Sequence, residues 1–239
     1  MGGKVTFTLD GVTVQADAGQ TIMEAADAAG IYIPRLCAKA GLSPHGSCRV
    51  CTVLVNSRPQ AACTQPVAAG AIVESDSGKM TEMRRRVLEM LFVEGNHFCP
   101  FCEKSGDCEL QALAYRLGIA APRYPYQFPI RDVDASHPDI YIDRNRCVIC
   151  GRCVRASKEL DDKNVFQFVE RGPRKSIAVN AEADLAETDA EAADQAMAAC
   201  PVGAIIRKRV GYATPYGRRL YDSTPIGSDI EAKRPAESV

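Results

Sequence analysis

Residues 147–153 read CVICGRC, and residues 200–201 read CP. Two residues separate each pair of neighbouring cysteines in the first stretch, and the remote cysteine of the second stretch precedes a proline. Thiolates are soft, anionic ligands for iron, and bacterial ferredoxins bind a cubane cluster with such a loop and a Cys-Pro ligand. The pattern therefore predicts one 4Fe-4S cluster, with the ligands Cys147, Cys150, Cys153 and Cys200.

The residues around this loop predict a ferredoxin-type unit. Residues 164–169 and 177–179 flank a Gly-Pro turn, which is typical of a hairpin. Residues 189–199 are expected to form a helix that leads directly to Cys200. We assign this unit to residues 126–210.

A second group of four cysteines lies nearer the N-terminus and consists of Cys37, Cys48, Cys51 and Cys63. Its first gap is longer than that of the plant-type C-x4-C-x2-C pattern. Small residues in that gap would let backbone N–H groups approach inorganic sulfide, namely Gly41, Ser43, Gly46 and Ser47. A 2Fe-2S cluster is the prediction. Structural zinc is the alternative, but zinc sites usually contain two C-x2-C pairs, and this group has one.

The sequence around this group predicts a small mixed sheet crossed by one helix, within a first unit of residues 1–78. Apolar residues alternate over residues 5–14 around an Asp-Gly turn, which indicates a hairpin. A capping-box pattern begins at Thr21 and predicts a helix that ends at Gly30. Two further strands are expected, over residues 51–55 and 71–73.

Three more cysteines lie between these groups and lack a fourth partner: Cys99, Cys102 and Cys108. His97 is the nearby side chain suited to iron, so we predict a 4Fe-4S site with one histidine and three cysteine ligands. His45 and His137 are expected to have no ligand role, because the group around His45 already has four thiolates and His137 lies in a turn-like Ser-His-Pro stretch.

Two predicted helices flank this third group, over residues 79–93 and 109–117, and each is followed by a glycine. They define a small helical unit of residues 79–125. Beyond Val210 the composition turns to Gly, Pro, Ser and charge, so residues 211–239 are expected to form an irregular arm that lies on a partner or stays mobile.

Composition limits the function classes. The three ligand sets use all eleven cysteines, and an odd number of thiols argues against a disulfide scaffold. The 29 basic and 30 acidic residues are interspersed, so the net charge of -1 carries no nucleic-acid signal. We find neither an export signal nor an apolar run of about 18 residues, and expect a cytoplasmic protein without membrane insertion.

Six arginines lie within a few residues of a predicted ligand: Arg35, Arg49, Arg144, Arg146, Arg152 and Arg155. Positive charge near a cluster stabilises its reduced, more anionic state and raises its potential. Solvated surface is the alternative interpretation, and the sequence leaves both open.

The three ligand sets, in this order, resemble the N-terminal part of the large iron-sulfur subunit of respiratory complex I and of iron-only hydrogenases. One residue separates His97 from Cys99, where complex I has three. The stretches 103–106 (EKSG), 128–131 (FPIR) and 208–212 (KRVGY) are similar to the small diaphorase subunit of bacterial NAD-reducing nickel-iron hydrogenases.

This resemblance implies an α+β chain with a β-grasp 2Fe-2S domain, a small helical 4Fe-4S domain and a ferredoxin-like 4Fe-4S domain. It also implies an electron relay without catalytic residues. The implied partners are a flavin subunit that holds FMN and exchanges hydride with NAD, and the small and large hydrogenase subunits, which hold the nickel-iron site. No Gly-rich dinucleotide loop follows a strand in this chain.

Two alternatives remain at this point. The equivalent subunit of an NAD-dependent formate dehydrogenase or of an electron-bifurcating hydrogenase would use the same ligand sets. A zinc-stabilised assembly module belongs to another class, and iron with labile sulfide would exclude it.

Overall fold

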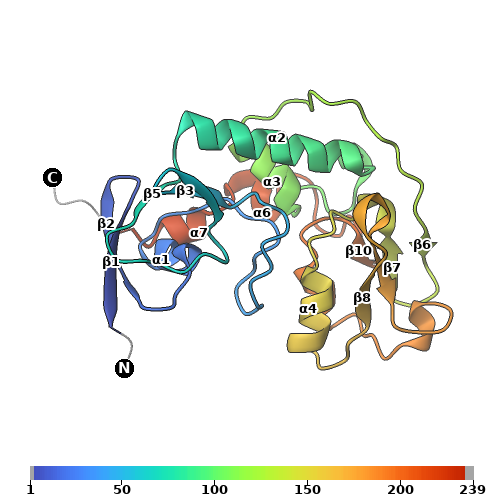
Figure 1. Ribbon diagram of the computed structural model, residues 1–239. Helices are drawn as coiled ribbons and strands as arrows, with labels where there is room; N and C mark the ends of the chain where they lie inside the picture. The colour runs from blue at the N-terminus through green and yellow to red at the C-terminus, as the bar shows by residue number, and fades with distance from the viewer. Residues whose placement is uncertain (1–2, 235–239) are drawn as a thin grey trace.

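In the computed structural model, which describes residues 3–234, the first part of the chain forms a mixed five-stranded sheet (Figure 1). Its strand order is β2-β1-β5-β3-β4. The predicted hairpin is confirmed, since β1 and β2 pair antiparallel, whereas β1 and β5 pair in parallel. The strands are β1 (Lys4–Leu9), β2 (Val12–Asp17), β3 (Thr52–Val55), β4 (Arg58–Ala61) and β5 (Ile72–Glu74).

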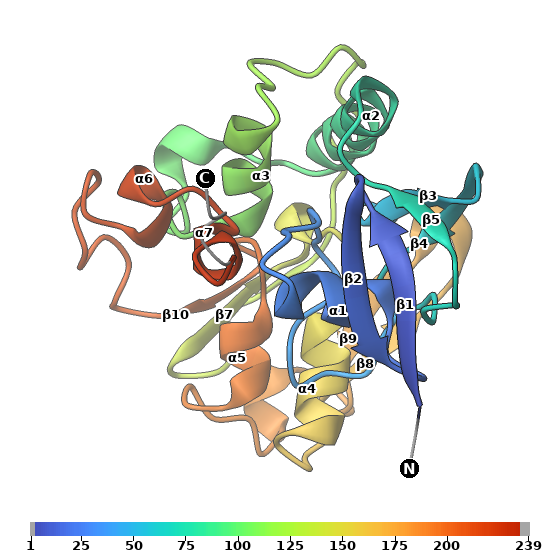
Figure 2. The same ribbon diagram turned by 90° about the vertical axis from the view of Figure 1, so that its left-hand side faces the viewer.

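Helix α1 (Ile22–Ala28) crosses this sheet, as predicted (Figure 2). Its capping box is formed in both directions, because Thr21 Oγ1 accepts the Glu24 N–H and Glu24 Oε2 accepts the Thr21 N–H. The apolar side of α1 packs with the inward face of the hairpin in one buried cluster that includes Phe7 and Leu9. The sheet and helix thus form the scaffold for the first cysteine group.

Strand β4 was not among the expected strands. Its second residue is Pro59, which lacks the N–H that a central strand needs. The strand nevertheless forms because it lies at the edge of the sheet and pairs only with β3.

Two helices flank the third cysteine group and confirm the prediction for this part of the chain. Helix α2 (Gly78–Glu94) is capped by Ser77 and ends at Gly95, and α3 (Glu109–Arg116) follows the ligand loop. A 3-10 turn, η1 (Cys99–Phe101), lies within that loop. In Figure 1, α2 spans the top of the molecule between the N-terminal sheet and the third unit.

The third unit contains a three-stranded sheet in the order β10-β7-β6 and the predicted hairpin of β8 and β9. Helices α4 and α5 pack against each other beside them. The elements are β6 (Val133–Asp134), β7 (Ile140–Asp143), η2 (Arg144–Arg146), α4 (Arg152–Glu159), β8 (Phe166–Val169), η3 (Gly172–Arg174), β9 (Ser176–Val179), η4 (Leu185–Glu187), α5 (Gln195–Ala199) and β10 (Ile205–Arg207).

The predicted helix over residues 189–199 is wrong in its first half, because α5 begins only at Gln195. The Asp194 carboxylate accepts the N–H of Glu191 and holds the preceding residues in a turn. The carboxylate of Asp161, from a distant loop, then accepts the N–H groups of Gln195 and Ala196 at 2.8 and 2.9 Å. Tertiary capping therefore sets the start of this helix.

The buried apolar residues of the second and third units form one continuous cluster. Leu110 and Leu113 of α3 belong to it, as do Phe166 of β8 and two residues from the first unit, Leu36 and Val50. The ligand loops of all three groups therefore surround a shared core, which fixes their relative positions.

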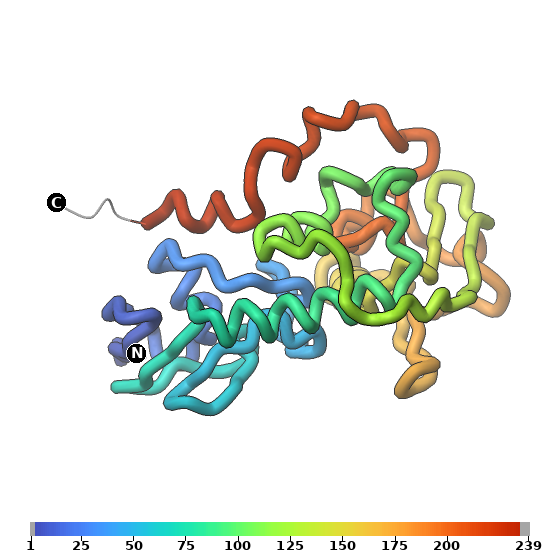
Figure 3. Tube along the Cα trace, turned by 90° about the horizontal axis from the view of Figure 1, so that it is seen from above, coloured from blue at the N-terminus to red at the C-terminus, as the bar shows by residue number. Residues whose placement is uncertain are grey.

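Residues 211–234, the C-terminal segment, lie on the chain itself and do not form the expected irregular arm. The segment contains α6 (Leu220–Ser223) and α7 (Ser228–Glu231) and runs back from the third unit toward the N-terminal sheet (Figure 3). Arg116 Nη1 donates to the carbonyl of Ile226 at 2.8 Å, and the Ile226 side chain is buried. The last five residues of the expected arm lie outside the described part. No helix within residues 3–234 is long and apolar enough to cross a membrane.

Candidate metal centres

The structure brings the four cysteines of the CVICGRC loop and the Cys-Pro stretch to the lining of one cavity. Cys147 and Cys150 come from the loop between η2 and α4, Cys153 lies in the first turn of α4, and Cys200 follows the C-terminus of α5. The backbone N–H of Ile149 donates to Cys147 Sγ at 3.4 Å, which is the inward-facing amide that a tight ligand loop requires. The rest of the lining is mostly apolar, with Phe166 and Ile177 among it.

Burial controls the protonation of these thiols. It raises the pKa of Cys147 to about 11 and that of Cys150 to about 12, and it raises the pKa of Cys153 well above its usual value. Neutral thiols are therefore favoured in the dry cavity until a cation compensates the charge. The donor set and its apolar walls fit a group that carries its own positive charge, such as an iron-sulfur cluster.

The loop geometry depends on Gly151. Its φ is +66°, and a Cβ at this position would lie 2.5 Å from the ring of Phe168. Only glycine combines that backbone conformation with so close an approach.

The four cysteines of the N-terminal group also lie together. The backbone N–H of Cys37 donates to Cys48 Sγ at 3.3 Å. Thiol hydrogen bonds connect Cys37 with Cys48 and Cys63, and Cys51 with Cys63. Cys37, Cys51 and Cys63 are almost completely buried, so the set is a buried cluster of thiols.

Hydrogen bonds from neighbouring thiols, those of Cys48 and Cys63 first, hold the pKa of Cys37 well below its usual range. The thiol of Cys63 likewise lowers the pKa of Cys51, to about 7. The pKa values of the two donors, Cys48 and Cys63, are raised by the same contacts. The four thiols therefore titrate as one hydrogen-bonded group, in which the remaining thiols stabilise a thiolate, and thiolates are the form that binds metal.

One prediction about this loop is wrong. Ser43 was expected to direct its N–H toward the sulfurs, but it donates to Glu159 Oε2 of α4 at 2.8 Å. Ser47 does contact the group, because its side chain has a hydrogen bond with the Cys37 thiol. Within this loop, Ser47 therefore contacts the cysteine group, whereas Ser43 contacts the third unit.

His97, Cys99, Cys102 and Cys108 line a third cavity between α2, α3 and the loop that follows β7. Burial raises the pKa of Cys108 to about 12 and also raises that of Cys99. Phe92 packs edge-on against the His97 ring, with a distance of 5.7 Å between ring centroids. The sequence-predicted set is thus assembled around one cavity.

The His97 ring is prepared for a ligand. Its Nε2 atom is buried and has no hydrogen-bond partner among residues 3–234. Burial, followed by the positive charge of Arg146, lowers the pKa of His97 to about 4, so the imidazole is neutral near pH 7. A neutral, unpartnered imidazole nitrogen beside three thiols has the donor chemistry that an iron site requires. No three His, Cys, Asp or Glu side chains in the described chain converge on a site for a single metal ion.

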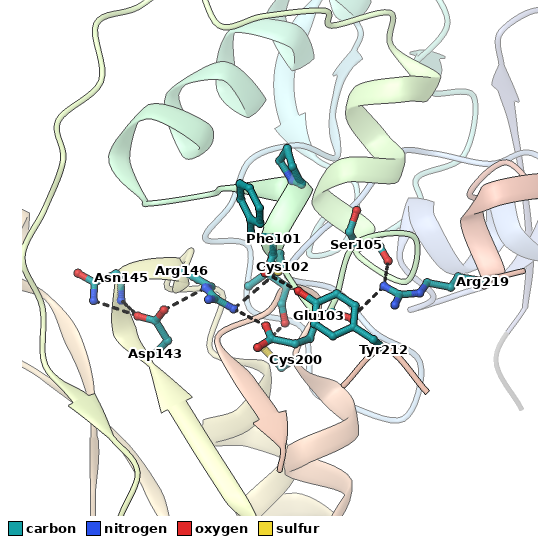
Figure 4. Close-up of polar contacts among 12 residues, drawn as sticks. Phe101, Cys102, Glu103, Ser105, Asp143, Asn145, Arg146, Cys200, Tyr212 and Arg219 are labelled. Atoms are coloured by element: carbon teal, nitrogen blue, oxygen red, sulfur yellow. Dashed lines mark hydrogen bonds and ion pairs between the residues drawn. The ribbon is translucent and has the colours of Figure 1, made fainter. Parts of the chain in front are cut away.

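Among the six arginines near ligands, one donates to a ligand sulfur within the described structure. Arg146 Nη1 lies 3.7 Å from Cys102 Sγ, although Arg146 is adjacent in sequence to a ligand of a different set (Figure 4). Arg35 instead pairs with Asp27, and Arg144 donates to the carbonyl of Ile177. Proximity in sequence therefore did not identify the arginine that contacts sulfur.

Arg155 connects the first and third ligand loops. Its Nη2 atom donates to the carbonyl of Cys37 at 2.7 Å and to that of Cys150 at 3.4 Å. Its Nη1 atom donates to the carbonyl of Ser43. The guanidinium is buried. Because both carbonyls belong to ligand residues, one side chain fixes the distance between these two sites.

Arg152 makes a comparable connection with the second set. Its guanidinium forms a two-bond ion pair with Glu109, the residue after Cys108, at 2.6 and 2.7 Å. It also donates to the carbonyl of Ala38 in the first ligand loop. A bidentate, buried arginine fixes orientation as well as distance.

The other two histidines make different contacts, although the Nε2 atom of His45, like that of His97, is buried without a hydrogen-bond partner among residues 3–234. The His45 ring stacks on Phe168, with 5.7 Å between centroids and 10° between planes. The ring of His137 contacts the carbonyl of Ala190 and accepts the N–H of Asp139, which is the expected turn.

Three family models match successive parts of the chain. A 2Fe-2S iron-sulfur cluster binding domain matches residues 2–78. The NADH-ubiquinone oxidoreductase-G iron-sulfur binding region matches residues 84–123, and a 4Fe-4S single cluster domain matches residues 140–206. The chain is thus a 2Fe-2S domain followed by two 4Fe-4S regions, which confirms the predicted cofactor classes.

Similar proteins extend the match over the whole chain. The 78 kDa subunit of mitochondrial NADH-ubiquinone oxidoreductase from Candida albicans is 34% identical over 95% of this chain, which spans 32% of that subunit. In the crystal structure of an NAD+-reducing NiFe-hydrogenase in the H2-reduced state, one chain is 46% identical, with a TM-score of 0.92 over 96% of this chain and 98% of that one.

The gamma subunit of the NAD-reducing hydrogenase HoxS from Cupriavidus necator is 42% identical over 91% of this chain and 93% of its own length. Identity at this level along nearly the full length of both chains decides between the related complexes. This chain belongs to the family of iron-sulfur gamma subunits of NAD-reducing hydrogenases.

Proposed function

We propose that this chain relays electrons between a hydrogenase module and a flavin subunit that reduces NAD. The observation that carries the proposal is the assembly of three separate ligand sets in one chain, each with at least one cysteine in or against the core of the second and third units. When bound, iron-sulfur clusters supply one-electron oxidation and reduction without bond-making at a substrate. The chain's own residues hold the three sites, exclude water from them and fix their spacing through Arg152 and Arg155.

We assign the twelve ligands in three sets. Cys37, Cys48, Cys51 and Cys63 hold the 2Fe-2S cluster in a β-grasp domain. His97, Cys99, Cys102 and Cys108 hold one 4Fe-4S cluster in a small helical domain. Cys147, Cys150, Cys153 and Cys200 hold the other in a ferredoxin-like domain. The shared cavity linings and the unpartnered His97 nitrogen support this assignment.

The partners follow from the family. A diaphorase subunit with FMN would exchange hydride with NAD, and hydrogenase small and large subunits would carry the nickel-iron site. Exposed aromatic residues on the C-terminal segment, Tyr212 and Tyr216, support a place for it at a subunit interface. We place the complex in the cytoplasm, because eleven free thiols are maintained in a reducing compartment.

The equivalent subunit of a formate dehydrogenase or of an electron-bifurcating hydrogenase is the less favoured function. A subunit of the NADP-reducing hydrogenase of Solidesulfovibrio fructosivorans is 35% identical, but this chain spans only 36% of it. The nearly full-length matches are to NAD-reducing hydrogenases.

Anaerobic purification of the native complex tests the proposal. The preparation is expected to reduce NAD with hydrogen as the electron donor and to contain iron and labile sulfide. Its spectrum after reduction should show paramagnetic clusters. Zinc in place of iron, or a complex without hydrogenase subunits, would overturn the proposal.

Replacement of His97 tests its role as a ligand. We expect His97→Ala to lose the paramagnetic signal of the second cluster, since one of four ligands is gone. His97→Cys should retain the cluster at a lower potential, because an anionic thiolate replaces a neutral imidazole. Redox titration followed by electron paramagnetic resonance measures both. His137→Ala is the matched control, because the hydrogen bonds of that ring in the described structure are to Ala190 and Asp139, neither of which is a predicted ligand. An unchanged signal and potential in His97→Ala would show that His97 is not a ligand.

A further inference from the structure

The guanidinium of Arg146 lies between two ligand sets. Arg146 is the last residue of η2 and directly precedes Cys147 of the third set. Its side chain nevertheless extends toward the second set, where Nη1 donates to Cys102 Sγ at 3.7 Å (Figure 4). A hydrogen bond to sulfur is longer than one to oxygen, and this one is charge-assisted because arginine is always protonated.

Two carboxylates hold the guanidinium in this position. Arg146 Nε pairs with Asp143 Oδ2 at 2.9 Å, and Nη1 also pairs with Glu103 Oε2 at 3.0 Å. Asp143 is itself fixed, because it accepts hydrogen bonds from the backbone N–H and the side-chain amide of Asn145. The Arg146 side chain is only 21% exposed. An arginine fork paired with two carboxylates, one of them fixed, has little freedom to leave the sulfur.

The backbone leaves room for this contact at Gly203. A Cβ at position 203 would lie 2.7 Å from Cys102 Sγ and 3.6 Å from Arg146 Nη1. Any side chain there would displace the sulfur, whereas the guanidinium lies at ordinary van der Waals distance. Glycine at position 203 therefore allows the backbone to lie close to both the sulfur and the cation at the second site.

We propose that Arg146 raises the reduction potential of the cluster held by the second ligand set, through its hydrogen bond to Cys102 Sγ. Asp143 and Glu103 are the positioning residues. Reduction adds negative charge to a cluster and its thiolates, and a cation at a ligand sulfur stabilises that state. The two carboxylates oppose this effect, Asp143 at Nε and Glu103 at the same Nη1 atom that donates to the sulfur. The guanidinium is the group in contact with the sulfur, so this contact determines the sign. The inference rests on the proposed function, because it requires a cluster at this site.

Redox titration of the intact complex, followed by electron paramagnetic resonance, tests the inference. At a fixed solution potential, Arg146→Gln is expected to reduce the ratio of reduced to oxidised second cluster about tenfold, which is about 59 mV for one electron. Arg146→Lys keeps the charge without the fork and should restore part of the ratio. Glu103→Gln removes a negative charge but keeps a hydrogen-bond acceptor, and should change the ratio in the opposite direction.

Arg144→Gln is the matched control, since Arg144 lies in the same η2 turn but donates to the carbonyl of Ile177. It removes the same charge and is expected to leave the ratio of the second cluster unchanged. Equal ratios in wild type and Arg146→Gln would overturn the inference, as would equal shifts in Arg144→Gln and Arg146→Gln. If Arg146→Gln loses the cluster, the Glu103→Gln variant provides the test. A ratio of reduced to oxidised second cluster in Glu103→Gln that is equal to or lower than that of the wild type would overturn the inference. A wild-type complex without the second cluster would contradict the proposed function instead.

Discussion

Cys150→Ala is expected to lower hydrogen-driven NAD reduction by the complex about 100-fold or more. Loss of a residue that only hydrogen-bonds to a metal ligand typically costs 10- to 100-fold in activity or metal affinity, and loss of a ligand should cost at least as much. Cys150 lies in the middle of the third ligand loop and lines its cavity with three other cysteines. A cubane with three of four thiolates is weakly held, because burial already disfavours the thiolate forms of Cys147 and Cys153 by raising their pKa.

Partial reactions separate loss of the relay from loss of the complex. NADH oxidation by an artificial dye at the flavin subunit, and hydrogen oxidation by a dye at the hydrogenase, should both persist in Cys150→Ala. Val154→Ala, which shortens a partly buried side chain on α4 without removing a ligand, is the control. Full hydrogen-to-NAD turnover in Cys150→Ala would show that the third cluster is not on the electron path.

Arg84→Met is expected to lower the free energy of unfolding by about 3–5 kcal/mol, since several buried acceptors lose a charged donor at once. Arg84 lies on α2 and is 3% exposed. Its guanidinium donates to the carbonyls of Val50, Thr52 and Ser75 and to the Ser75 hydroxyl, at distances of 2.8–3.2 Å. These bonds attach α2 to the first sheet. Burial lowers the pKa of Arg84, because a charged guanidinium loses hydration in the interior. The hydrogen bonds to those carbonyls offset this cost of burying the charge.

Urea unfolding of the cluster-loaded complex, followed by circular dichroism, measures the lower free energy of unfolding. The urea concentration at the midpoint should fall, while the dependence of the free energy on urea concentration should stay similar. Arg86→Met is the matched control on the same helix. Arg86 is exposed and pairs with Glu82 one turn away, so its replacement should change stability by about 0.5 kcal/mol or less. Equal midpoints for the two variants would show that the buried bonds of Arg84 contribute nothing.

Much of the local structure was predictable because its causes lie within a few residues. Alternation around the Asp10-Gly11 turn predicted the first hairpin, and the Thr21–Glu24 capping box predicted α1. The failures have non-local causes. The start of α5 depends on Asp161, from a loop distant in sequence, and β4 forms despite Pro59 because of its place at a sheet edge.

The candidate sites likewise combine features with local causes, which were predictable, and features with non-local causes, which were not. Cysteine spacing predicted which thiols share a cavity in the two 4Fe-4S regions, and the lack of a fourth thiol pointed to His97. Spacing did not predict that Ser43 turns toward Glu159, nor that the C-terminal segment packs on its own chain. Both contacts join residues more than a hundred positions apart, and neither leaves a local pattern.

The sequence by itself determined the class of cofactor and predicted the ligands and their grouping, because a cluster requires donors of one chemical type at short and regular spacings. Only the tertiary structure decided how the sites are coupled: Arg155 contacts two ligand carbonyls, and Arg146, beside one set, donates to the sulfur of another. The physical reason is that a long arginine side chain reaches whatever the packing of the core places near it. Its partner is therefore set by contacts between distant segments and not by its neighbours in sequence.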